Sequence, residues 1–194
     1  KLGHLRQQRQ CPQMTGLRCF VAVELPQPMR EEIGRLQSRI AANGLRLVRP
    51  ELVHVTIKFL GDVQREEVGN VTGALGKVKA SPFPAKVQGM GAFPGRAVRV
   101  VWLGLTGDFQ ELYSNVQQAL GPLGFAPEDR GFSAHVTLGR VARPSPQMSR
   151  LLGERIAEFS SLDLGGFNVD RFYLKKSTLT SGGPIYENLA EFPL

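Results

Sequence analysis

The tripeptide His-Val-Thr occurs twice in this chain of 194 residues, at residues 54–56 and again at residues 135–137. Both copies stand in apolar, β-branched runs, "ELVHVTIKFLG" and "FSAHVTLGRV", which are typical of strands. The chain has three histidines, and the third, His4, lies in a polar N-terminal segment to which we assign no role. A motif repeated in this way favours a fold that holds its two copies in equivalent positions.

The segments around the two motifs follow the same order. Phe20 precedes His54 by 34 residues, Val101 precedes His135 by 34 residues, and the two histidines are 81 residues apart. Alternating residues predict strands, and apolar residues at helical spacing predict helices between them. The predicted strands are 17–25, 45–61, 83–95, 97–105, 132–141, 164–177 and a final edge at 182–194, and the predicted helices are 28–44, 64–80, 107–124 and 145–159.

This order predicts an α+β fold built from two duplicated β-α-β-α-β halves. We expect one bilobed, pseudo-twofold domain over residues 14–194, with a central cleft between two mainly antiparallel sheets. The lobes are placed at about residues 14–95 and 96–194, and an exchange of strands between them is left open. Residues 1–13 are interpreted as a tail or extension.

Each motif places two reactive side chains on one face of its strand. Residues two apart on a strand project to the same side, so His54 pairs with Thr56, and His135 with Thr137. If the two strands meet, two imidazoles that titrate near neutrality and two hydroxyl donors converge on the cleft. One imidazole can then activate a nucleophile while the other protonates a leaving oxygen, and the threonines can bind phosphate oxygens. The pattern favours metal-free phosphoryl chemistry.

A zinc site is the alternative chemistry for paired histidines. Two histidines without a cysteine or a well-placed carboxylate fall short of the usual zinc ligand set. The two cysteines, Cys11 and Cys19, form neither a disulfide framework nor a metal site. We therefore expect no metal and no cofactor.

The charge of the chain indicates an anionic partner. Its 24 lysines and arginines exceed its 17 aspartates and glutamates, which gives a formal net charge of +7. Such an excess is typical of proteins that bind nucleic acids or phosphate esters, although genomic base composition would explain the arginines equally well. Since no apolar run approaches the roughly 18 residues of a membrane span, we expect a cytoplasmic monomer that binds no membrane.

The quoted stretches also resemble a known family. "HVTI" and "HVTL" are similar to the paired HxTx signatures of the two-histidine phosphoesterase superfamily. "RCFVAVELP", "VRPELVHVTIKFLGDV" and "STLTSGGPIYENLAEFPL" resemble its RNA 2′,3′-cyclic phosphodiesterases, which are also described as 2′-5′ RNA ligases. The resemblance spans about residues 16–194.

This resemblance implies roles for individual residues. It makes His54 the proton donor to the leaving 3′ oxygen and His135 the proton acceptor from water, so the product would be an RNA 2′-phosphate. Thr56 and Thr137 match the threonines of the motif, and Arg140 matches an arginine that the family uses near the phosphate. Alternation along the strand would turn Arg140 away from Thr137 unless a bulge at Gly139 re-aims it.

Two further residues are candidates for substrate binding. Phe20 could stack on a nucleobase, or it could belong to the core. Lys58 falls on the same face as His54 and Thr56 by alternation, and it could contact a phosphate there.

These observations predict an enzyme that hydrolyses RNA 2′,3′-cyclic phosphodiester ends to 2′-phosphomonoesters. Reverse 2′-5′ ligation would use the same acid and base in exchanged roles. One alternative is a phosphodiesterase for a small cyclic nucleotide or for ADP-ribose cyclic phosphate. Another is a non-catalytic RNA-binding module, against which the matched histidines argue, because binding alone needs no acid–base pair.

Overall fold

The structure is a computed structural model that describes residues 16–94, 97–127 and 131–194. The tail predicted at residues 1–13, with His4 and Cys11, lies outside these residues. The strands are β1 (Gly16–Glu24), β2 (Leu45–Leu47), β3 (His54–Gln64), β4 (Phe83–Phe93), β5 (Val100–Thr106), β6 (His135–Val141), β7 (Asp163–Val169), β8 (Arg171–Thr180) and β9 (Gly183–Pro193). The helices are α1 (Gln27–Ile40), α2 (Val68–Leu75), α3 (Phe109–Leu120) and α4 (Pro146–Glu158), and the 3-10 turns are η1 (Pro50–Leu52), η2 (Arg65–Glu67) and η3 (Gly121–Leu123).

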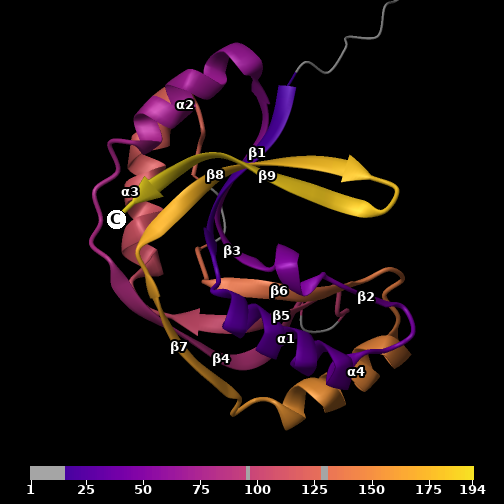
Figure 1. Ribbon diagram of the computed structural model, residues 1–194. Helices are drawn as coiled ribbons and strands as arrows, with labels where there is room; N and C mark the ends of the chain where they lie inside the picture. Colours follow the sequence, from indigo (N-terminus) through magenta and orange to yellow (C-terminus); the bar gives the residue numbers. More distant parts are fainter. Residues whose placement is uncertain (1–15, 95–96, 128–130) are drawn as a thin grey trace, which may run out of the picture.

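The strands form one curled antiparallel sheet in the order β7-β4-β5-β6-β3-β1-β8-β9, and β2 pairs with β6. Its two arms meet at β3 and β6, which share a single paired position, Val55 opposite Val136. We call the strands β3, β1, β8 and β9 the β3 arm, and β6, β5, β4 and β7 with β2 the β6 arm. Figure 1 shows the β8–β9 hairpin lying over β6 and β2. The predicted α+β class with antiparallel strands is confirmed.

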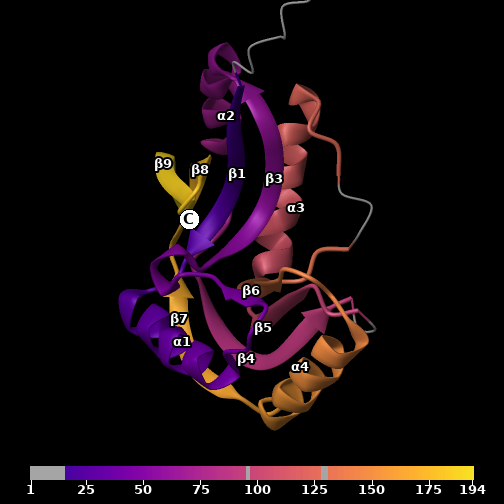
Figure 2. The ribbon, with the colours of Figure 1, turned by 90° about the vertical axis from the view of Figure 1, so that its right-hand side faces the viewer.

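The four helices cover the outer side of the curled sheet (Figures 1 and 2). Helices α2 and α3 lie on the β3 arm, where α3 contacts β3, and α1 and α4 lie together on the β6 arm, where α4 contacts β4. Helix α3 shows why these faces pack: its buried side chains recur every three or four residues, at Phe109, Leu112, Val116 and Leu120. Each such side chain contributes about 1.5–3 kcal/mol on burial. In the described part of the chain, no helix is long and apolar enough to cross a membrane.

Several predicted elements have different boundaries. The stretch 45–61 is not one strand, because η1 begins at Pro50, which has no backbone N–H to donate, and separates β2 from β3. Strand β3 does not end at Gly61 but passes through it, with φ of +72°, to Gln64. The stretch 164–177 is likewise divided into β7 and β8.

A bulge in each central strand changes which side chains face the concave side. On β3, Val21 pairs with Lys58 while Ala22 pairs with Thr56, so one extra residue stands between those two positions. On β6 the same irregularity places an extra residue between Thr137 and Gly139, against Trp102 and Val101 of β5. An extra residue reverses the alternation that follows it.

The two bulges decide the predictions for Lys58 and Arg140. Lys58 is turned to the helix side, where it is 2% exposed and its Nζ donates to the carbonyl of Ala126 at 2.7 Å. Its predicted place beside His54 is therefore wrong. Arg140 is turned the other way, onto the face of Thr137, as the predicted bulge at Gly139 required.

Strand pairing also shows which residues of the two halves are equivalent. Phe20 stands opposite Phe59, and Val100 stands opposite Arg140. Phe20 and Val100 therefore hold equivalent places, whereas the equal 34-residue spacings had matched Phe20 with Val101. The difference of one residue arises because the equal spacings do not take account of the bulges in the paired strands.

Candidate active site

The two His-x-Thr pairs lie on the concave side of the sheet, on the two strands where the arms meet. Val55 and Val136 between them are fully buried on the opposite side, at 0% exposure. The antiparallel register set by this valine pair places His54 across from Thr137. It likewise places Thr56 across from His135, so the imidazoles occupy one diagonal, about 7–8 Å between residues in a regular sheet.

Both imidazoles are held by the same backbone contact. Nδ1 of His54 donates to the carbonyl oxygen of Leu52 at 2.8 Å, and Nδ1 of His135 donates to that of Ser133 at 2.8 Å. A carbonyl can only accept a hydrogen bond, so each Nδ1 carries a proton. Nε2 is therefore the nitrogen that gains or loses a proton in each ring, which is the arrangement that a matched acid and base require.

Aromatic rings fix His54 further. Phe20 lies 5.0 Å from the imidazole between ring centres, and Tyr186 meets it edge-on at 5.3 Å. Phe20 also contacts Phe59 and Tyr186 and is 3% exposed, which leaves little of its ring open to a nucleobase. The core interpretation of Phe20 is the one that this packing favours.

His135 has a different aromatic environment. Phe93 meets its ring edge-on at 5.3 Å, Trp102 lies 6.4 Å away, and these two neighbours stack on each other at 5.0 Å. Phe93 is 40% exposed, so this side of the site is open to solvent. Neither Phe93 nor Trp102 was selected from the sequence.

Burial lowers the pKa of His54 to about 4. The charges of Lys175 and His135 act in the same direction, while the bond to the Leu52 carbonyl and the charge of Glu24 oppose it. His54 is therefore uncharged at neutral pH in the protein alone. A phosphate anion placed against the ring would favour the charged imidazolium and raise this pKa.

A cleft of about 990 Å³ opens on the concave side. His54, Thr56, Thr137 and Arg140 border it, whereas His135 lies beyond its border on the same face of β6 as Thr137. The β8–β9 hairpin forms one wall, and the segment from β2 to η1 forms another. Cationic and apolar side chains alternate along these walls: Arg18, Arg46, Arg49, Leu47, Phe59 and Leu179.

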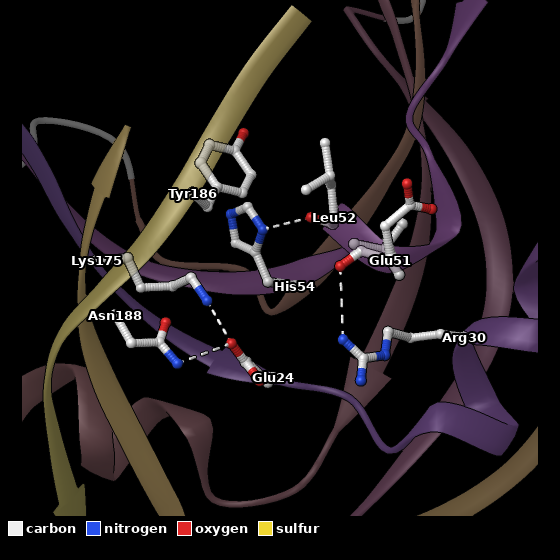
Figure 3. Close-up of a pocket in the computed structure, with 9 residues that line it drawn as sticks. Glu24, Arg30, Glu51, Leu52, His54, Lys175, Tyr186 and Asn188 are labelled. Atoms are coloured by element: carbon white, nitrogen blue, oxygen red, sulfur yellow. Dashed lines mark hydrogen bonds and ion pairs between the residues drawn. The ribbon is translucent and has the colours of Figure 1, made fainter. Parts of the chain in front are cut away.

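A second, smaller cavity of about 260 Å³ lies on another side of His54 (Figure 3). Glu24, Lys175 and Asn188 border it, and Tyr186 borders both this cavity and the cleft. Sequence reasoning missed these four residues. A usable signal existed for two of them, since Glu24 and Lys175 are charges inside otherwise apolar strands.

A metal site does not emerge from the geometry of the described segments. No three His, Cys, Asp or Glu side chains of residues 16–94, 97–127 and 131–194 lie together as metal ligands do. The groups that converge on the cleft are imidazoles, hydroxyls and a guanidinium, which can move a proton and bind anionic oxygens.

A duplicated α+β fold with two facing His-x-Thr pairs beside an arginine-lined cleft defines a two-histidine phosphoesterase. The chain belongs to the LigT like Phosphoesterase family, whose model matches residues 23–102 and 104–186. Each matched segment contains one His-Val-Thr, at His54 and at His135, which agrees with the duplication.

Known proteins similar to this chain agree with the family. RNA 2′,3′-cyclic phosphodiesterase of Archaeoglobus fulgidus is 36% identical over 180 residues, covering 91% of this chain and 99% of that protein. The protein of the same name from Methanocaldococcus jannaschii is 33% identical over 178 residues, covering 91% and 100%. Among solved structures, TT0787 of Thermus thermophilus is 27% identical with a TM-score of 0.77, covering 92% of this chain and 98% of that one. LigT of E. coli, solved with 3′-AMP, shares the fold at 23% identity, with a TM-score of 0.75 and coverage of 92% and 98%.

Proposed function

We propose that this protein hydrolyses the 2′,3′-cyclic phosphodiester end of RNA to a 2′-phosphomonoester. The observation that carries the proposal is the pair of imidazoles with matched tautomers, each with an Nε2 free of its backbone bond and each beside a threonine hydroxyl. The names of the similar archaeal proteins support the same substrate. One domain over residues 14–194 would carry both halves of the site.

The proposed mechanism assigns one proton transfer to each histidine. Nε2 of His135 takes a proton from water, whose oxygen attacks phosphorus, and Nε2 of His54 gives a proton to the leaving 3′ oxygen. Thr56 and Thr137 donate hydrogen bonds to the non-bridging oxygens as charge builds on them, and Arg140 supplies a positive charge. No metal is assigned a step.

The proposal requires His54 to gain its proton as substrate binds. Because burial holds the pKa of His54 near 4, the substrate phosphate must supply the negative charge that favours the imidazolium. After the reaction, His135 returns its proton to solvent and His54 regains one. Run backwards, with the 5′-hydroxyl of another RNA in place of water, the same two groups would join a 2′-5′ linkage in exchanged roles.

The cleft supports RNA as the substrate. Arg18, Arg46 and Arg49 lie beyond the His-x-Thr pairs, where the backbone of a longer strand would pass. Exposed Phe59 and Leu179 offer apolar surface for its bases. We also propose a cytoplasmic monomer, since one chain supplies both half-sites and its buried Cys19 is a free thiol.

The test is hydrolysis of an oligonucleotide with a 2′,3′-cyclic phosphate end, with the position of the product phosphate established by NMR. We expect a 2′-phosphate and equal rates with and without EDTA. Turnover of a cyclic mononucleotide or ADP-ribose cyclic phosphate but not the oligonucleotide would favour a small-molecule enzyme. Tight RNA binding without turnover would identify an RNA-binding module instead.

A further inference from the structure

The two histidines have the same backbone contact but different neighbours on the adjoining strand. Glu24 of β1 stands directly opposite His54, whereas the equivalent position opposite His135 on β5 is Gly104. A carboxylate therefore lies beside one imidazole and has no counterpart beside the other. The duplication itself does not explain this difference.

Glu24 does not stand alone, because Lys175 of β8 is bound to it (Figure 3). Nζ of Lys175 donates to Oε1 of Glu24, and Nδ2 of Asn188 donates to the same oxygen at 3.4 Å. The Lys175 side chain is 8% exposed and also lies over the ring of Tyr173 at 5.6 Å. A buried ion pair loses much of its attraction to desolvation, so stability alone is a weak reason for a charged pair here.

The pair lies beside His54 but away from the cleft. Glu24 and Lys175 border the 260 Å³ cavity and are absent from the border of the cleft in which a phosphate would lie. His54 and Tyr186 border both spaces. Any effect of the pair on the reaction must therefore pass through His54.

We propose that Glu24 and Lys175 are a positioning pair that sets the protonation of His54 and so makes the two histidines unequal. The pair balances a negative and a positive charge against one imidazole, and the other imidazole has neither. The link to catalysis rests on the proposed function, in which His54 is the proton donor.

The electrostatic argument depends on every charged or titratable group that faces His54. The carboxylate of Glu24 raises the pKa of His54, and the cation of Lys175 lowers it. Glu24 remains charged because, although burial alone would raise its pKa, Lys175, Asn188 and Arg30 together bring that pKa below its usual value. The groups that face His54 are Glu24 from β1, Arg30 from α1, Glu51 from η1, His135 from β6, Lys175 from β8 and Tyr186 from β9, and Arg18 and Arg140 lie on the cleft side of Tyr186.

This balance makes opposite predictions for the two partners. Lys175→Met leaves the Glu24 carboxylate uncompensated, so the His54 titration should move upward by about one pH unit from its midpoint of about 4. Glu24→Gln leaves the cation of Lys175, so His54 should stay uncharged down to pH 4. The double variant removes both charges and should titrate close to the wild type.

The measurement is an NMR titration of the imidazole signals from pH 4 to pH 8. The chain has three histidines, and His135→Asn and His4→Asn variants assign the His54 signal. Lys176→Met is the matched control, because Lys176 is the next residue on β8 and pairs with Glu187 at 2.6 Å; it should leave the His54 titration unchanged. A His54 midpoint that stays in place in Lys175→Met, or moves equally in Lys176→Met, would overturn the positioning role. The double variant keeps this test valid if Lys175→Met alone fails to fold.

Kinetics then separates this inference from the proposed function. With His54 as donor, the alkaline limb of the kcat/KM profile should move upward in Lys175→Met and downward in Glu24→Gln. NMR shifts with an unmoved alkaline limb would keep the positioning pair and remove His54 from the donor role. A protein without any phosphodiesterase activity would still give the NMR result, so the two failures are distinguishable.

Discussion

Arg140 and Thr137 point to the same side of β6, although regular alternation would place residues three apart on opposite faces. The bulge between them is held from two directions. The carbonyl of Leu138 accepts hydrogen bonds from the backbone N–H of Val48 at 2.9 Å and from Nε2 of buried Gln37 at 2.9 Å. A guanidinium is thereby fixed beside a hydroxyl that can bind the same phosphate.

Replacing Arg140 with Gln should lower kcat/KM for a cyclic phosphate about 10- to 100-fold. The reason is that a hydrogen bond to a charged group contributes about 1.5–3 kcal/mol. Arg140→Lys keeps the charge without the planar fork and should lie between the two. Arg143→Gln is the control, because Arg143 is exposed and does not border the cleft. Equal losses in both glutamine variants would mean that Arg140 acts only through overall charge.

Replacing His54 or His135 with Asn should lower kcat about 10²- to 10⁴-fold each, because general acid–base catalysis contributes that much per group. Asn keeps an amide N–H where Nδ1 donates, so the contacts with the Leu52 and Ser133 carbonyls can persist. Single-turnover rates and circular dichroism of both variants provide the measurement. A variant that retains near wild-type turnover would remove that histidine from the mechanism.

The stability of the protein should depend on His54 at acidic pH. Its pKa of about 4 in the folded protein lies below the ordinary value of about 6.5 expected in the unfolded chain. Between these values the unfolded chain binds the proton more readily, so the contribution is complete above about pH 6.5 and is lost as pH falls toward 4. We expect about 2–3 kcal/mol of unfolding free energy to disappear between pH 7 and pH 4.5. Urea unfolding should show a correspondingly smaller loss in His54→Asn.

An anion in the cleft should reverse the neutrality of His54. Sulfate does not titrate near neutrality, so any proton taken up on binding belongs to the protein. We expect saturating sulfate to raise the His54 midpoint in an NMR titration by one pH unit or more, as an opposite charge within about 4–6 Å does. Arg140→Gln should weaken sulfate binding. A midpoint that sulfate leaves near 4 would favour the exchanged assignment, with His135 as the acid.

Salt should separate binding of an RNA strand from binding of its end. Each phosphate contact on a single strand steepens the dependence of log affinity on log salt by about 0.7. Arg46→Gln and Arg49→Gln should each reduce the slope for an oligonucleotide by about that amount, while the KM of a cyclic mononucleotide responds weakly. Equal slopes for the two substrates would mean that the arginines of the cleft do not contact RNA, and the small-nucleotide alternative would then be preferred.

The sequence predicted the two His-x-Thr pairs because a strand has a fixed period of two, and both motifs precede the bulges. Beyond the bulges its success depended on a marker. Gly139 signalled the irregularity in β6, so the correct face for Arg140 could be foreseen. The equivalent bulge in β3 falls at Ile57 and Lys58, without a glycine, and alternation therefore gave Lys58 the wrong face.

The charged pair beside His54 could not be predicted in the same way. Glu24 and Lys175 are 151 residues apart, and they meet because β8 joins β1 on the side opposite β3. Neither residue belongs to a motif, and local patterns carry no information about which strand becomes the neighbour. The same limit applies to Tyr186, which reaches His54 from the edge strand β9.

The single paired position between β3 and β6 has a mechanical consequence. Strand β3 is laced to β1 along most of its length, and β6 is laced to β5, but the two arms are joined to each other by Val55 and Val136 alone among the described strand pairs. Bending the sheet at this seam changes the separation of the two Nε2 atoms while leaving each His-x-Thr pair intact. The protein thus holds its acid and its base like the two jaws of a pair of pliers, with the pivot directly beneath the bond that is to be broken.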